Sequence, residues 1–263
     1  MDTKQLNTRH YGYIGKGDDN CNVTKPLAQQ MSGIPIGIVL LNVGYPIVPG
    51  NVANACTWDF PVSYVKINNV DSPRLHTKDP TIIDELAAAA QELVDQNGVR
   101  AVICACGYFG RWQKQLRDRV DVPVYASSLI QIPMIRMGLK KDQKIGVLCA
   151  VTRTFDNELL ACCGVDDPSG LVIKSMEEAP EFSAIPRDRD TMNNEKCRQE
   201  FIQAAKDMVA ENPDIGAILL ECSDMPPYAS AIQDAVNLPV YDFTTMVRWV
   251  ESAVCRKPFY GYI

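Results

Sequence analysis

Histidine is scarce in this sequence, and so are paired cysteine motifs. Only His10 and His76 occur among the 263 residues, and none of the ten cysteines forms a C-x-x-C pair. The ligand spacing of a structural zinc site is therefore missing, and we expect no metal. No basic stretch is dense enough to follow a phosphate backbone, since 26 Lys and Arg stand against 32 Asp and Glu, a net charge of −6. We therefore expect no nucleic-acid partner.

Long apolar runs are also lacking. The longest lies near residues 34–41 and falls short of the roughly 18 residues that a membrane span needs, so we expect no membrane association. Residues 1–5 are polar and do not resemble a signal peptide. The cysteines are accordingly predicted to be reduced thiols of a cytoplasmic protein. With 46% hydrophobic residues, the chain can form one large α/β domain or two small lobes.

Residues 99–129 and 215–246 repeat one pattern. In each, an apolar run is followed by a cysteine, a short turn, an amphipathic segment and the sequence Val-Pro-Val-Tyr or Leu-Pro-Val-Tyr. Cys106 precedes Pro123 by 17 positions, and Cys222 precedes Pro239 by 17 positions. A second pair of apolar runs, residues 34–41 and 144–149, agrees with this repeat. The sequence therefore predicts two copies of one β/α unit.

The predicted fold class is α/β, with two pseudo-symmetric α/β lobes, central and mostly parallel sheets, and an active site in the cleft between the lobes. We expect a polar N-terminal arm over residues 1–33, a first lobe over 34–130 and a second lobe over 131–241. A closing helix within 242–263 is expected to pack back on the first lobe. Equivalent positions of duplicated units face each other, so Cys106 and Cys222 should oppose each other at the carboxyl ends of strands.

Two facing thiols indicate proton-transfer chemistry. Cys106 and Cys222 each follow a buried strand and precede a helix start, a setting that is expected to lower the pKa of a thiol toward neutrality. A thiolate and a thiol on opposite sides of a substrate could remove a proton from one face of a stereocentre and return one to the other. Such a reaction needs no cofactor, provided that backbone N–H groups and hydroxyls stabilise the intermediate.

The predicted substrate is a small-molecule carboxylate. The loop over residues 42–51 contains two prolines and two glycines directly after a strand, so it is expected on the rim of the cleft. The residues expected to bind the substrate are Asn42, Tyr45, Gly107, Tyr108, Ser127, Ser128, Thr152 and Ser223.

Three other ionisable residues have two interpretations each. Glu221 could tune the neighbouring Cys222 or point to the opposite face of its strand, and the alternation of strand residues favours the second. Asp224 could cap the next helix or contact a substrate amine. His76 lies in a polar turn and is expected to be exposed to solvent rather than catalytic.

The motifs also resemble a known family. In order along the chain they are P-I-G-I-V-L-L-N, Y-P-x-x-P-G-N-V-x-N, T-W-x-F-P-V, A-C-G-Y-F, S-S-L and L-L-E-C-S-D-M-P-P-Y-A. Over residues 34–250 they resemble the aspartate/glutamate/hydantoin racemase superfamily, whose members work without pyridoxal phosphate. The resemblance implies two α/β lobes with the active site between them, Cys106 and Cys222 as the catalytic pair, and no cofactor. We also expect a homo-oligomer, either a dimer or a tetramer.

The resemblance does not fix the reaction, because the superfamily also contains isomerases, an arylmalonate decarboxylase and dimethylsulfoniopropionate lyases. Our first hypothesis is a racemase of aspartate or glutamate type that uses both cysteines. The alternatives are a lyase or decarboxylase on the same scaffold and a catalytically silent carboxylate-binding protein. The family commonly has Asp at the end of the first strand, where this sequence has Asn42. This departure counts against a standard amino-acid racemase and motivates the lyase alternative.

Overall fold

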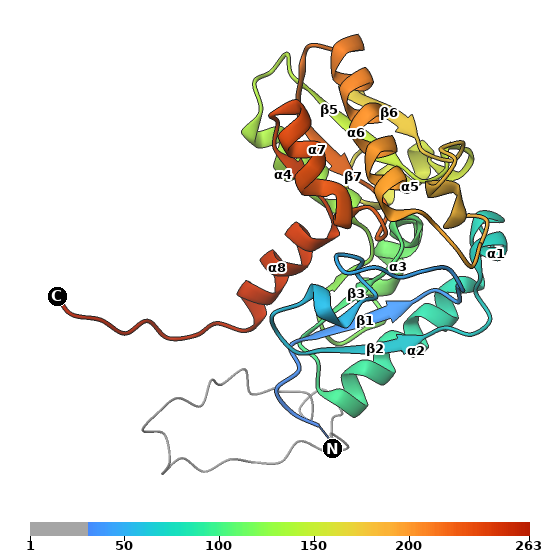
Figure 1. Ribbon diagram of the computed structural model, residues 1–263. Helices are drawn as coiled ribbons and strands as arrows, with labels where there is room; N and C mark the ends of the chain where they lie inside the picture. Colours follow the sequence, from blue (N-terminus) through green and yellow to red (C-terminus); the bar gives the residue numbers. More distant parts are fainter. Residues whose placement is uncertain (1–30) are drawn as a thin grey trace.

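The computed structural model describes residues 31–263, so the N-terminal arm predicted over residues 1–33 lies almost entirely outside the described residues. Two four-stranded parallel sheets form two lobes (Figure 1). The first sheet has the order β2-β1-β3-β4 and the second the order β6-β5-β7-β8. The strands are β1 Ile36–Leu40, β2 Val62–Lys66, β3 Ala101–Cys104, β4 Val124–Tyr125, β5 Lys144–Cys149, β6 Leu171–Ser175, β7 Ile215–Leu220 and β8 Val240–Tyr241.

The identical strand order of the two sheets confirms the predicted two-lobe α/β fold. In each sheet, the first strand lies between the second and the third, and all neighbours are parallel. The third strand then pairs with a short fourth strand at the edge. The repeat in the sequence therefore corresponds to a repeat in topology, and β3 is equivalent to β7.

Helices connect the parallel strands and cover the sheets. They are α1 Ser72–His76, α2 Ile82–Asn97, α3 Gln113–Arg117, α4 Ile132–Gly138, α5 Asn157–Cys162, α6 Asn194–Glu211, α7 Ala229–Val236 and α8 Phe243–Val254. Alanines at 87–90 favour α2, and Gly98 ends it in the left-handed conformation with φ of 63°. None of the helices within residues 31–263 is both long and apolar enough to cross a membrane.

The first sheet is covered on both faces. On one face, α2 packs against β1, where Gly37 leaves room for Leu93. On the other face, α8 buries Phe243, Met246 and other apolar side chains against Ile36 and Ile38. The C-terminal helix therefore returns to the first sheet although it follows the last strand of the second (Figure 1).

The segment after Cys106 differs from the helix start that the sequence predicted there. It forms a 3-10 helix over Gly107–Trp112 and then only the short α3. Gly110 approaches the second lobe so closely that a Cβ there would lie 2.5 Å from Cys163 Sγ. Close packing between the lobes and two helix-disfavouring glycines explain why a regular α-helix does not begin here.

Candidate active site

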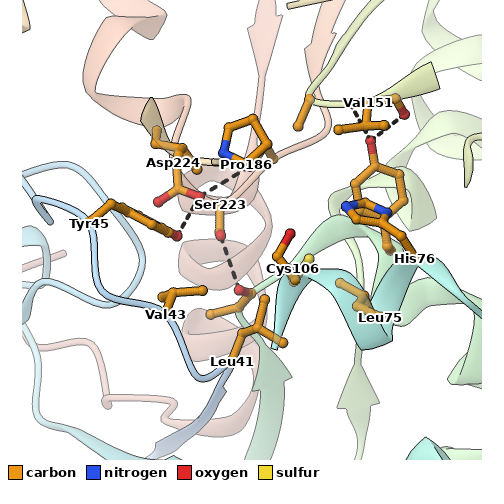
Figure 2. Close-up of a pocket in the computed structure, with 16 residues that line it drawn as sticks. Leu41, Val43, Tyr45, Leu75, His76, Cys106, Val151, Pro186, Ser223 and Asp224 are labelled. Carbon is orange, nitrogen blue, oxygen red and sulfur yellow. Dashed lines mark hydrogen bonds between the residues drawn. The ribbon is translucent and has the colours of Figure 1, made fainter. Parts of the chain in front are cut away.

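One pocket lies where the carboxyl ends of the two sheets meet, and both predicted cysteines line it (Figure 2). Cys106 lies two residues beyond β3, and Cys222 lies two residues beyond β7. The pocket has a volume of about 420 Å³, counting its open mouth. Its lining comprises Leu41, Val43, Tyr45, Ser72, Leu75, His76, Ala105, Cys106, Tyr108, Ala150, Val151, Ile185, Pro186, Cys222, Ser223 and Asp224.

Asp224 is the centre of a hydrogen-bond network on one side of this pocket. Its carboxylate accepts a hydrogen bond from the Tyr45 hydroxyl at 3.0 Å and one from the Cys222 thiol at 3.2 Å. It also accepts a hydrogen bond from the Asn51 amide. Burial raises the pKa of Asp224 above its ordinary value. Burial, followed by the charge of Asp224, raises the pKa of Tyr45 well above its usual range. Asp224 therefore faces the pocket and does not cap the helix that follows.

Asn51 was not among the residues predicted to form the site. Its side chain is buried and fixes Asp224 from the far end of the loop over residues 42–51. The position of that loop directly after a strand indicated that the loop as a whole lies at the cleft. Asn51 also belongs to the motif Y-P-x-x-P-G-N-V-x-N, but the motif did not indicate its contact, because its partner lies 173 residues away.

The two thiols differ from the prediction in their pKa. Burial raises the pKa of Cys106 well above its ordinary value, and Glu221 adds to the increase. Burial also raises the pKa of Cys222, with Asp224 as the next cause. The expected lowering by a helix start is wrong, because the turn after Cys106 is a short 3-10 helix and carboxyl groups surround the sulfur atoms. Both groups are therefore neutral thiols near pH 7.

Each thiol also has its own hydrogen-bond environment. The backbone N–H two residues further along donates to each sulfur, that of Tyr108 to Cys106 and that of Asp224 to Cys222, and both bonds favour a thiolate. Cys222 differs because its thiol also donates to the Asp224 carboxylate. The two cysteines are equivalent in the repeat but not in their chemistry.

Glu221 does not line the pocket, whereas its neighbour Cys222 does. Its side chain is fully buried, and Oε2 accepts from the Ala150 backbone N–H at 3.2 Å. Burial raises its pKa to about 8. The side chain lies behind the pocket, against Gly107 in the turn that follows Cys106.

His76 is also not the solvent-exposed residue that was expected. It lies at the end of α1, lines the pocket, and packs edge-on against the Tyr108 ring with centroids 5.2 Å apart. Its Nδ1 atom is 3.0 Å from the Thr154 hydroxyl oxygen. Burial, together with the charge of Arg153, lowers its pKa to about 4, so the imidazole is neutral near pH 7.

The predicted substrate-binding residues divide into two groups. Tyr45, Tyr108 and Ser223 line the pocket. Gly107 does not; it lies behind Cys106 with its backbone against Glu221.

Four further predicted residues do not line the pocket either. Asn42 donates to the Asn68 carbonyl and accepts from Lys66. Ser127 caps the 3-10 helix that follows it. Ser128 Oγ lies 3.0 Å from the carbonyl oxygens of Leu220 and Glu221, and Thr152 is exposed outside the pocket.

Charge in the pocket is one-sided. No Lys or Arg is among the described residues that line it, and Asp224 supplies the carboxylate. Within residues 31–263, no three His, Cys, Asp or Glu side chains gather closely enough to hold a metal ion. The arrangement can bind a small molecule, accept a cationic group near Asp224 and transfer a proton through a thiol.

No protein-family model matches the chain. Among characterised proteins, it is similar to a dimethylsulfoniopropionate lyase of Durusdinium sp. clade D, with 29% identity over 232 residues that cover 86% of this chain and 77% of that protein. It is also similar to dimethylsulfoniopropionate lyase 6 of Emiliania huxleyi, with 27% identity over 235 residues, or 86% of this chain. The chain spans 61% of the length of that second relative.

Solved structures share the fold at low identity. An arylmalonate decarboxylase mutant aligns with a TM-score of 0.57 and 16% identity over 87% of this chain and 98% of that one. The aspartate racemase of Picrophilus torridus aligns with a TM-score of 0.55 and 13% identity, over 86% of this chain and 96% of that one. A glutamate racemase of Bacillus anthracis aligns with a TM-score of 0.54 and 15% identity, over 84% of this chain and 82% of that one. With its two parallel sheets of identical strand order, the chain therefore has the fold of the aspartate/glutamate racemase superfamily.

Proposed function

We propose that this protein is a carbon–sulfur lyase that cleaves dimethylsulfoniopropionate, or a small sulfonium carboxylate like it, to dimethyl sulfide and acrylate. The observation that carries the proposal is the position of Asp224, a buried carboxylate beside a thiol in a pocket that no Lys or Arg among the described residues lines. The similarity to proteins named dimethylsulfoniopropionate lyases supports the same reaction. The enzymatic relatives and the fold support an enzyme, whereas the choice of lyase over racemase is our inference.

The two ends of the pocket suit the two ends of such a zwitterion. Figure 2 shows Tyr45 and Asp224 on one side, His76 on the other, and Cys106 between them. A sulfonium group gains from a carboxylate and from the face of a nearby tyrosine ring. The substrate carboxylate would lie toward His76, whose neutral imidazole can donate an N–H.

The substrate's own charge would activate the thiol. Burial and neighbouring carboxyl groups raise the pKa of Cys106. A cation within about 4–6 Å favours the ionised form of an acid, so a bound sulfonium offsets this increase. The N–H of Tyr108 already points at the sulfur that would carry the charge. We therefore assign Cys106 as the base, and Cys222 as the thiol that stays protonated against Asp224.

The reaction is a β-elimination. The Cys106 thiolate removes a proton from the carbon next to the substrate carboxylate, and the C–H electron pair becomes the new C=C double bond. The C–S bond breaks, and its electron pair leaves with sulfur as neutral dimethyl sulfide. After the thiol returns its proton to solvent, one substrate molecule has given one dimethyl sulfide, one acrylate and one proton.

A cofactor-independent racemase is the second candidate, because both thiols line the same pocket. Racemisation requires two groups that exchange the roles of acid and base. The thiols have unequal environments, since each has a backbone N–H near its sulfur but Cys222 also donates to the Asp224 carboxylate. That asymmetry favours a reaction with a single base.

The test is gas chromatography of the headspace over purified protein incubated with dimethylsulfoniopropionate, with acrylate followed by NMR. Dimethyl sulfide and acrylate should form in equal amounts. Cys106→Ala should reduce the rate by about 100-fold or more, the usual contribution of a general base. Cys56→Ala is the matched control, because Cys56 is exposed and outside the pocket, and it should retain full activity.

A second incubation, of aspartate and glutamate in D2O, separates the two candidates. Deuterium entering the α-position without any release of dimethyl sulfide from dimethylsulfoniopropionate would replace the lyase proposal with the racemase. Full lyase activity of Cys106→Ala would refute the assignment of the base.

A further inference from the structure

Glu221 is a buried acid that the elimination as described does not use. Its side chain is fully buried directly behind the pocket, next to Cys222 in the sequence. Oε2 accepts from the Ala150 backbone, but Oε1 has no hydrogen-bond partner among the residues that the structure describes. The nearby Tyr108 hydroxyl donates to the Val151 carbonyl at 2.6 Å instead. Buried polar atoms without a partner are uncommon and costly.

The free oxygen lies against the turn that carries Cys106. A Cβ on Gly107 would be 2.6 Å from the Glu221 carboxyl carbon and closer still to Oε1. The carboxyl group therefore touches the backbone one residue after the proposed base. Only glycine at position 107 leaves space for this contact.

Ionisable groups surround the Glu221 carboxyl from several elements. Those with an electrostatic interaction with it are Cys106 and Tyr108 after β3, Cys149 at the end of β5, Cys163 after α5, and Cys222 and Asp224 after β7. All six are acids, and none can supply a positive charge. An ionised Glu221 would therefore add a second negative charge beside any thiolate in the pocket.

We propose that Glu221 is a positioning residue that keeps its proton behind the pocket and thereby permits the Cys106 thiolate to form. Burial supports this role, because it raises the pKa of Glu221 to about 8. As a neutral acid, the group costs less without a partner for Oε1 than a buried anion would. Once the acid ionises at higher pH, its charge opposes the thiolate. The catalytic part of this inference rests on the proposed function. The effect of the Glu221 charge on the Cys106 thiol can be measured without any substrate.

The test follows alkylation of Cys106 by iodoacetamide, quantified by peptide mass spectrometry, from pH 6 to pH 9.5 in the wild type and in Glu221→Gln. The amide matches the neutral acid in shape and cannot ionise. At pH 6 to 7 the two rates should agree within about twofold. At pH 9 the variant should react about fivefold faster or more, because one pKa unit is a tenfold change in thiolate fraction. Glu211→Gln, which removes a carboxylate from an exposed position, should follow the wild type throughout.

If the ratio of the alkylation rates of Glu221→Gln and the wild type is the same at pH 6 and at pH 9, the proposal is overturned. Should Glu221→Gln fail to fold, Glu221→Met is a second neutral replacement of similar length, with the same expected ratios. Release of dimethyl sulfide measured over the same pH range adds the catalytic readout, in which the variant should keep activity at a higher pH than the wild type. If the wild type releases none while the alkylation ratios hold, the proposed function fails and the role of Glu221 remains.

Discussion

The contact between Gly107 and Glu221 makes Gly107→Ala a sharp test of the site. A Cβ there would lie 2.6 Å from the Glu221 carboxyl carbon and closer still to the Glu221 carbonyl oxygen, whereas ordinary contacts begin at 3.4 Å. Because one of the atoms is backbone, no rotamer change can relieve the overlap. Overpacking usually costs about 1–3 kcal/mol, and we expect about 3 kcal/mol or more here. With a urea dependence of about 3 kcal/mol per molar, the unfolding midpoint would fall by about 1 M.

The assay is urea unfolding followed by circular dichroism, with two glycine variants as controls. Gly146→Ala also has a close neighbour at 2.5 Å, but that atom is Cε of Met208, the end of a flexible side chain. Gly146→Ala should therefore lose clearly less unfolding free energy than Gly107→Ala. Gly138→Ala, in α4, meets nothing within 4 Å and should be neutral or stabilising by up to about 1 kcal/mol. A midpoint for Gly107→Ala within about 0.2 M of the wild type would refute the packing of Glu221 against this turn.

Two further predictions concern stability. Glu221 holds its proton in the folded chain up to about pH 8 but loses it near 4.5 once unfolded, so its contribution to stability is complete below pH 4.5 and is lost as pH rises to 8. Relative to Glu221→Gln, the wild type should lose up to about 5 kcal/mol of unfolding free energy over this range; parallel curves from urea titrations at each pH would contradict this. Phe201→Ala should cost about 3–5 kcal/mol, because the fully buried ring stacks on Tyr228 and meets Phe182 edge-on. Exposed Gln203→Ala, on the same helix, should stay within about 0.5 kcal/mol in the same thermal and urea melts.

The repeat in the sequence was enough to predict the fold and the location of the pocket. Equal spacing after two apolar runs put Cys106 and Cys222 at equivalent places, and β3 and β7 occupy equivalent positions in their sheets. Side chains at the ends of strands were harder to predict. Asn42 and Tyr45 belong to one loop, yet only Tyr45 reaches the pocket, because Asn42 is held by Lys66 and the Asn68 carbonyl.

The charge state of the site could not be predicted from local sequence. A cysteine before a helix start suggested a low thiol pKa, but burial and the carboxyl group of Glu221 act in the opposite direction on Cys106. Similarly, the polar turn around His76 suggested exposure, whereas α1 brings the ring against Tyr108. Both errors have the same origin. The burial of a side chain, and with it the desolvation that shifts its pKa, depends on which other segments of the chain cover that side chain.

The sequence by itself determined two lobes of one β/α unit and a cysteine beyond the third strand of each. Hydrophobic periodicity and turn residues act over a few positions, so they can be recognised without coordinates. Only the tertiary structure decided that Tyr45 and Asn51 hold Asp224, at separations of 179 and 173 residues, and that the Glu221 carboxyl lies against Gly107, next to Cys106. Such contacts depend on how distant segments pack together, and that packing sets the burial and the charge on which the chemistry of the pocket depends.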